Sequence, residues 1–205
     1  FSEIDYLIKN YDISYIALRE ELFATDNERV RQFCERVRVY DFDWSIQLRI
    51  DSINQELVDL LKNTRCRYLF VGVESADDRV LKSMRKGITL TQIEHALDML
   101  RDAGLNSRSG VIFGDTVESF ETAMFTLDWF KKNYTKYRIF VDMIIAFPGS
   151  VLYRRACDSG VIPNPVEFLK DGCPIVNVSQ MNDTEFATLV TTIEKMNYRK
   201  YNVKY

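Results

Sequence analysis

Charged residues and glycines follow five short apolar runs of this sequence, where predicted strands end. They are the acid pair Glu20-Glu21, Arg49, the segment Gly72-Val73-Glu74-Ser75, the segment Gly110–Gly114, and Ala146-Phe147-Pro148-Gly149. In folds of parallel strands joined by helices, the loops after the strands build the binding site. Such a set can hold a ligand with an amino group, a carboxylate and hydroxyls, and glycines let the backbone approach a flat ring.

Each of these features also has a purely structural explanation. The pair Glu20-Glu21 is compatible with a solvated loop, and Arg49 with an ion pair inside a barrel. Gly72 and Gly110 can relieve crowding between strands, and Glu118 can interact with the first turn of a helix. The residue types alone therefore leave both explanations open.

Histidine and cysteine offer little further chemistry. His95 is the only histidine, and because it lies on an expected outer helix we assign it a structural role. Neither a serine–histidine triad nor a histidine metal site can then be built. The four cysteines lack the short spacing of a zinc site or cluster loop, and we expect buried thiols in a reducing compartment: Cys34, Cys66, Cys157 and Cys173.

Apolar runs that alternate with helical patterns position the candidate residues. We expect strands at Ile13–Leu18, Trp44–Ile50, Tyr68–Val73, Gly110–Phe113 and Arg138–Phe147. Apolar residues at helical spacing predict a helix after each strand, and the pair Thr25 and Glu28 resembles a capping box. Such alternation implies parallel pairing with right-handed crossovers.

Two architectures fit this alternation, an open doubly wound sheet and a complete or partial barrel. The run from Trp44 to Ile50 has a polar face formed by Ser45, Gln47 and Arg49. A doubly wound sheet buries both faces of its strands, so the polar face favours the barrel, with these side chains in its lumen. Residues 161–178 contain three of the four prolines and no helical period. We therefore expect a barrel over residues 1–160 and a C-terminal extension over 161–205.

Composition excludes some classes of function. The formal net charge is −3, and basic and acidic residues are interspersed along the sequence. The sequence therefore contains no basic stripe of the kind that indicates nucleic-acid binding. Neither a secretory signal nor an apolar run long enough for a membrane span is present, and we expect a cytoplasmic protein. The sequence starts at Phe1, inside an apparent helix, which suggests a piece of a longer polypeptide.

The ordered motifs resemble the radical S-adenosylmethionine (SAM) superfamily, in particular the subgroup often fused to cobalamin-binding domains. The resemblance covers roughly residues 1–160. It rests on Glu20-Glu21-Leu22-Phe23, Phe33-Cys34, Arg49-Ile50-Asp51, Gly72-Val73-Glu74-Ser75, Leu81-Lys82-Ser83-Met84-Arg85-Lys86-Gly87 and Pro148-Gly149-Ser150. Each motif is weak alone, but the order and spacing of the whole set are specific.

This resemblance implies a TIM-like partial (β/α)6 barrel that binds SAM across its strand ends. It places Glu20-Glu21 at the methionine amino group, Glu74 at the ribose, and Arg49 and Lys86 at the carboxylate. Arg85 competes with Lys86 for that position. The expected contacts near the adenine are Gly110, Ile112, Gly114, Ala146 and Phe147. Gly72 is a further expected SAM-binding residue.

The sequence departs from the family pattern in three respects. Glu20-Glu21 replaces the commoner aspartate pair, and Gly114-Asp115-Thr116-Val117-Glu118-Ser119 replaces Gly-x-Pro-Gly-Glu-Thr. The Cys-x3-Cys-x2-Cys loop that binds a [4Fe–4S] cluster is absent, and in the family it precedes the position of Phe1. We expect the cluster ligands outside this chain, in an upstream part of the same polypeptide with or without a cobalamin domain.

In the family, the reduced cluster cleaves SAM to a 5′-deoxyadenosyl radical, which abstracts a substrate hydrogen. The substrate, a small molecule or a peptide, and the catalytic residues that contact it are not identified by the sequence. Two alternatives stay open: a non-catalytic barrel that has lost the cluster, and an unrelated βα-barrel enzyme. The second predicts glycine-rich phosphate loops near the last strands, where only Pro148-Gly149 is found.

Overall fold

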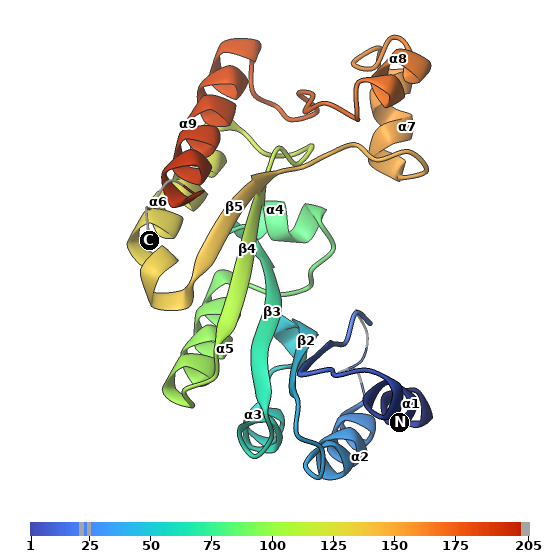
Figure 1. Cartoon of the computed structure of the whole chain (residues 1–205). Coiled ribbons are helices and arrows are strands. Elements are labelled where there is room, and N and C mark those ends of the chain that lie inside the picture. The colour runs from blue at the N-terminus through green and yellow to red at the C-terminus, as the bar shows by residue number, and fades with distance from the viewer. Residues whose placement is uncertain (21–22, 24–25, 202–205) are drawn as a thin grey trace. The chain divides into compact units, whose positions relative to one another are not determined.

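The computed structural model describes residues 1–20, 23 and 26–201, and its strands and helices alternate along the chain (Figure 1). The strands are β1 (Tyr15–Ala17), β2 (Asp43–Arg49), β3 (Cys66–Glu74), β4 (Ser107–Phe113) and β5 (Ile139–Met143). They form one parallel sheet in the order β1-β2-β3-β4-β5. The predicted α/β class is confirmed, and the strand order agrees with a partial barrel.

The helices follow the expected apolar stripes. They are α1 (Ser2–Asn10), α2 (Asn27–Val37), α3 (Gln55–Lys62), α4 (Asp78–Ser83), α5 (Leu90–Asp102), α6 (Phe120–Tyr137), α7 (Val151–Asp158), α8 (Pro165–Lys170) and α9 (Asp183–Tyr201). The side chain of Asp26 caps α2 by accepting hydrogen bonds from the N–H groups of Glu28 and Arg29. Thr25, predicted as part of that cap, lies outside the described residues. Among the described residues, no helix combines the length and hydropathy of a membrane span.

Residues 161–178 show no helical period in the sequence, yet they contain the short helix α8. Helix α8 begins after Asn164, whose side chain accepts hydrogen bonds from the N–H groups of Val166 and Glu167, and Pro165 occupies its first turn. A capping asparagine followed by proline is a helix-start signal, since proline has no N–H to leave unpaired there. The helix is short, so it shows no clear apolar period.

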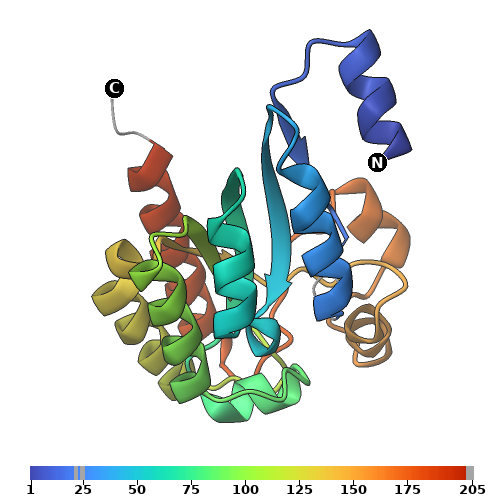
Figure 2. The same ribbon diagram turned by 90° about the horizontal axis from the view of Figure 1, so that it is seen from below.

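The chain divides into two compact units. The first comprises Phe1–Val73, Thr91–Ser109 and Thr135–Arg138. In it, the apolar face of β2 is buried as predicted, with Trp44, Ile46 and Leu48 in the core. Helices α2 and α3 lie side by side (Figure 2). On the other face of β2, Ser45 is also buried, because the Tyr15 hydroxyl lies over it and donates a 2.6 Å hydrogen bond to its Oγ.

The second unit comprises Glu74–Leu90, Gly110–Tyr134 and the chain from Ile139 onward. Helix α9 runs alongside β5 (Figure 1), and Asn197 Nδ2 donates to the carbonyl oxygen of Val141. Helices α7 and α8 enclose a small apolar cluster of Ala146, Ala156, Ile162 and Phe168. The expected boundary between a barrel and an extension at residue 160 stays a prediction.

Candidate functional site

The last residue of β3, Glu74, forms an ion pair with Lys86. The distance from Lys86 Nζ to Glu74 Oε1 is 2.6 Å, and the two side chains are 26% and 18% exposed. Helix α4 positions Lys86, because the Lys86 N–H donates to the carbonyl oxygen of Leu81 as the helix ends. Arg85, the competing candidate, is exposed. The structure therefore favours Lys86 as the cation beside the end of β3.

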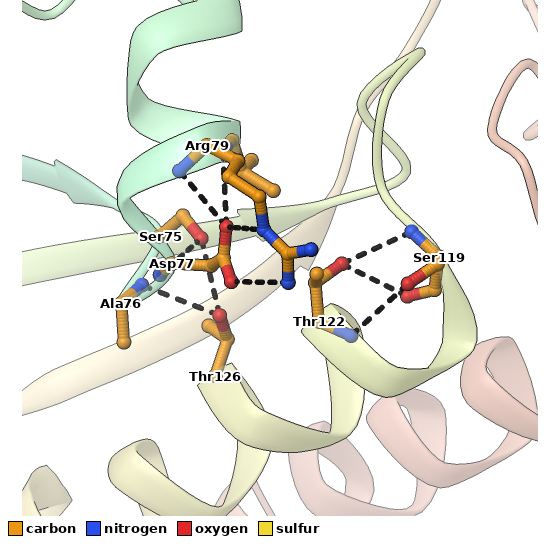
Figure 3. Close-up of polar contacts among 8 residues, drawn as sticks. Ser75, Ala76, Asp77, Arg79, Ser119, Thr122 and Thr126 are labelled. Carbon is orange, nitrogen blue, oxygen red and sulfur yellow. Dashed lines mark hydrogen bonds and ion pairs between the residues drawn. The ribbon is translucent and has the colours of Figure 1, made fainter.

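Glu74 has a backbone φ of 68°, which is unfavourable for a residue with a side chain. The following turn is held by hydroxyl groups (Figure 3). Ser75 Oγ lies 3.1 Å from Thr126 Oγ1 of α6, and the same threonine oxygen accepts the N–H of Ala76. Ser75 Oγ also accepts the N–H of Asp77. The unusual conformation of Glu74 thus adjoins a buried polar network, as is common at functional sites.

Asp77 begins α4 and joins this network (Figure 3). Its carboxylate accepts the N–H groups of Arg79 and Val80 and receives two further bonds from the Arg79 guanidinium. Burial alone would raise the pKa of Asp77, but the bonds from Arg79 and the backbone together lower it. The helix that positions Lys86 therefore starts at a firmly ionised cap.

Strand β4 and the residue after it carry three of the predicted residues. Gly110 and Gly114 are buried, and Ile112 is half-buried. Gly114 has a φ of 103°, so a side chain there would be strained. Its N–H donates a 2.6 Å hydrogen bond to Glu118 Oε2, while Glu118 Oε1 has no partner among the described residues. Burial raises the pKa of Glu118 to about 7.

Ala146 and Phe147 lie beyond the end of β5, which was predicted to reach residue 147 but ends at Met143. Ala146 is 2% exposed and packs into the apolar cluster of α7 and α8. Phe147 is 59% exposed and offers its ring to solvent. Of this pair, Phe147 is the better candidate for contact with a flat ring.

The predicted residues of the first unit have charged neighbours of their own. Arg49 donates two hydrogen bonds of 2.9 and 2.7 Å to Asp51, and this pairing raises the pKa of the Arg49 guanidinium. Glu20 accepts two hydrogen bonds from Arg29. Gly72 is half-buried on β3, and Glu21 lies outside the described residues. The ion pairs Arg49–Asp51 and Arg29–Glu20 are both exposed, so they contribute little to the stability of the fold.

The described residues do not fit a metal cluster. No group of three or more histidine, cysteine or acidic residues is arranged to hold a metal ion in the part of the chain that the structure describes. Burial raises the pKa of Cys34 to about 11 and raises that of Cys66 further. Because a cluster is bound by thiolates, these protonated thiols are poor ligands. The expectation of four buried thiols is met only by Cys34, since Cys66, Cys157 and Cys173 are half-buried.

The second unit contains residue types that are compatible with SAM. Lys86 offers an ammonium group, Glu74 a carboxylate, and Gly114 a backbone without Cβ atoms, while Phe147 offers an exposed ring. The ammonium group suits a carboxylate, the carboxylate suits ribose hydroxyls, and the bare backbone and the ring suit a purine.

Sequence reasoning missed three features of this site. Two of them are contacts between separate elements, Glu74 with Lys86 and Ser75 with Thr126. No periodic pattern in a sequence predicts such contacts. The capping role of Asp77 had a signal, since an aspartate stands directly before an apolar helical stripe.

Comparisons with known proteins match this chain to one family description and to several curated relatives. The family description "Radical SAM superfamily" matches residues 7–149. An uncharacterized methyltransferase from Pyrococcus horikoshii is 25% identical over 162 residues, which cover 78% of this chain and 35% of the relative. An anaerobic magnesium-protoporphyrin IX monomethyl ester cyclase from Rubrivivax gelatinosus is 27% identical over 135 residues, covering 62% of this chain and 24% of the relative.

A solved structure has a similar fold. The radical SAM methyltransferase TsrM from Kitasatospora setae, with cobalamin and a [4Fe–4S] cluster bound, superposes with a TM-score of 0.64 at 16% identity. The superposition covers 78% of this chain and 31% of that chain. The present chain therefore spans about a third or less of the length of these proteins.

Proposed function

Because the chain belongs to the radical SAM superfamily, we propose that it forms the SAM-binding part of an enzyme that cleaves SAM to a 5′-deoxyadenosyl radical. The electron for this cleavage would come from a [4Fe–4S] cluster bound by cysteines outside the described residues. The residues of this chain bind and orient SAM and shield it from water.

The ion pair of Glu74 and Lys86 is the observation that carries this proposal. Lys86 suits the carboxylate of the methionine moiety, and Glu74 suits the ribose hydroxyls. A mostly buried ion pair adds little to stability, because lost hydration offsets the attraction. Its position at a strand end, beside a left-handed backbone residue, therefore favours a binding role.

The adenine would lie against the end of β4. Ile112 is half-buried there and presents an apolar edge, and Gly114 has no side chain to obstruct a ring. Phe147 supplies an exposed aromatic surface that can stack on a purine.

The reaction of the whole protein is a separate proposal. The similar curated proteins include a methyltransferase and a cyclase, so we propose methyl transfer or ring formation on a small-molecule or peptide substrate. The similarity to a cobalamin-bound structure supports a cobalamin domain upstream in the same polypeptide. Free cysteines among the described residues support a reducing compartment, and we propose the cytoplasm.

Calorimetric titration of SAM into the full-length, cluster-loaded protein tests the proposed site. Loss of one buried charge-assisted contact should weaken binding about 10- to 150-fold in Glu74→Ala and in Lys86→Ala. Arg85→Ala is the matched control, because Arg85 is adjacent, cationic and exposed. Its dissociation constant should stay at the wild-type value.

Activity provides the second measurement. The reduced full-length protein should release 5′-deoxyadenosine from SAM, and both site variants should release it more slowly at low SAM concentration. The site assignment is wrong if both variants stay folded and bind SAM as tightly as wild type. A full-length protein that binds SAM without releasing 5′-deoxyadenosine would instead favour the non-catalytic barrel.

A further inference from the structure

A threonine of α6 touches the segment that follows Glu74. Thr126 is fully buried, and its Oγ1 accepts the N–H of Ala76 at 3.3 Å and lies 3.1 Å from Ser75 Oγ (Figure 3). Ser75, also fully buried, in turn accepts the N–H of Asp77. One hydroxyl thus links α6 to the turn between β3 and α4.

The position of this link matters because of the conformation that precedes it. Glu74 has a φ of 68°, a value that a residue with a side chain keeps only when its surroundings enforce it. The next residues, Ser75 and Ala76, are the ones bonded to Thr126. Without that bond, Glu74 would be freer to return to an extended conformation, which would swing its carboxylate away from Lys86.

The hydrogen bonds indicate that the hydroxyl group of Thr126, and not its methyl group, holds the turn. The Ala76 N–H and the Ser75 hydroxyl are both buried beside Thr126, so each loses a partner if the hydroxyl is removed. A valine has nearly the same shape as threonine but cannot accept or donate. A serine keeps the hydroxyl and loses only a methyl group.

We infer that Thr126 is a positioning residue for SAM binding: it fixes the Ser75–Ala76 backbone and thereby keeps the Glu74 carboxylate in the orientation that receives the ribose. This inference rests on the proposed function, because it assumes that Glu74 binds SAM. Thr126 itself acts only through Glu74 and does not contact the ligand.

A matched control lies one turn earlier on the same helix. Thr122 is 2% exposed, and its hydroxyl also bonds to backbone, accepting the N–H of Ser119 and donating to the Ser119 carbonyl oxygen (Figure 3). Its hydrogen bonds among the described residues go to Ser119 at the start of α6 and not to the turn after Glu74. Thr122→Val therefore makes the same chemical change at similar burial without touching the Glu74 segment.

The experiment compares Thr126→Val, Thr126→Ser, Thr122→Val and Glu74→Ala in full-length, cluster-loaded protein. SAM affinity is measured by calorimetry at equal folded fraction, and amide hydrogen exchange is measured at Ala76 and Asp77. Thr126→Val should weaken SAM binding about tenfold, the effect of one net hydrogen bond, and should speed exchange at both amides. Thr126→Ser should restore both properties, and Thr122→Val should leave both at wild-type values.

The controls separate two kinds of failure. If Glu74→Ala weakens SAM binding but Thr126→Val does not, the inference about Thr126 is wrong and the proposed function stands. Unchanged exchange at Ala76 and Asp77 in Thr126→Val also overturns it. If Glu74→Ala leaves SAM affinity unchanged, the proposed role of Glu74 is wrong, and the inference falls with it.

Discussion

The backbone N–H of Gly114 donates a 2.6 Å hydrogen bond to Oε2 of Glu118, across the turn that ends β4. Glu118 is fully buried, and its second carboxylate oxygen has no partner among the described residues. The same residue is tied to the later chain, since the Gln180 N–H donates to the Glu118 carbonyl oxygen. A titratable group thus supports the loop expected beside the adenine.

The pH dependence of stability should reveal this carboxyl group. Burial raises its pKa from 4.5 to about 7, so the folded state binds more protons than the unfolded state between these values. The stabilisation from proton binding is complete below pH 4.5 and is lost as the pH rises to about 7. Each pKa unit corresponds to about 1.4 kcal/mol, so the loss amounts to about 3 kcal/mol.

Chemical denaturation of the chain at pH 5 and pH 8 measures this effect. Glu118→Gln cannot titrate, so its free energy of unfolding should change by about 3 kcal/mol less between these pH values than that of wild type. Glu121→Gln, at an exposed position on α6, should behave like wild type. Equal pH dependence of Glu118→Gln and wild type would contradict the assignment.

A second prediction concerns the absence of a side chain at Gly110. A Cβ atom built there would lie 2.7 and 2.9 Å from Cζ and Cε2 of the Phe140 ring. Gly110→Ala should therefore destabilise the chain by about 1 kcal/mol, the low end for overpacking, because the partly exposed ring of Phe140 can shift.

A double-mutant cycle with Phe140→Leu identifies the cause. The alanine should cost much less in the Phe140→Leu background, as measured by urea denaturation. Ser109→Ala, on the neighbouring strand position, is the control: the Ser109 hydroxyl is buried without a partner among the described residues, so its removal should not destabilise. Equal costs of Gly110→Ala in both backgrounds would show that Phe140 is not the obstacle.

Local sequence patterns predicted most of the sheet but not all of its limits. The alternation from Trp44 to Ile50 predicted the buried apolar face of β2, since a strand alternates its faces, but not the burial of Ser45 on the polar face. The run that ends at Phe147 was predicted as strand, yet the strand ends at Met143. Ala146 is apolar because it packs against helices α7 and α8, and composition cannot distinguish such burial from burial in a sheet.

The candidate site was predictable in part, through the resemblance of its motifs. Glu74 and Lys86 could be named in advance, but their pairing depends on how α4 returns toward β3. Thr126 could not be found, because it lies 51 residues from Ser75 and looks like any threonine on a helix. Contacts between distant elements depend on tertiary packing, which has no local signature.

The cysteines support a third prediction. After anaerobic reconstitution with iron and sulfide, this chain alone should contain no bound iron and show no visible absorption, because the raised pKa values of Cys34 and Cys66 keep both thiols protonated. Cys34→Ala and Cys66→Ala should give the same null result by iron analysis. Stoichiometric iron and sulfide that are lost in either variant would overturn this expectation.

The last prediction compares two arginines of the first unit at opposite ends of the strands. Arg49 is the last residue of β2 and pairs with Asp51, whereas Arg65 precedes β3 and pairs with Asp41 and Asp43. Both are exposed and ion-paired, so removing either should change the free energy of unfolding by less than about 1 kcal/mol. They differ in position, since binding sites of parallel βα folds lie at the carboxyl ends of strands.

SAM binding by the full-length, cluster-loaded protein should therefore distinguish Arg49→Ala from Arg65→Ala. If Arg49 binds the SAM carboxylate, as the resemblance implies, Arg49→Ala should raise the dissociation constant about 10- to 150-fold. Arg65→Ala should leave it at the wild-type value. If Arg49 serves only its exposed pair with Asp51, the two variants will bind SAM equally well. In that case Lys86 is left as the proposed partner of the carboxylate.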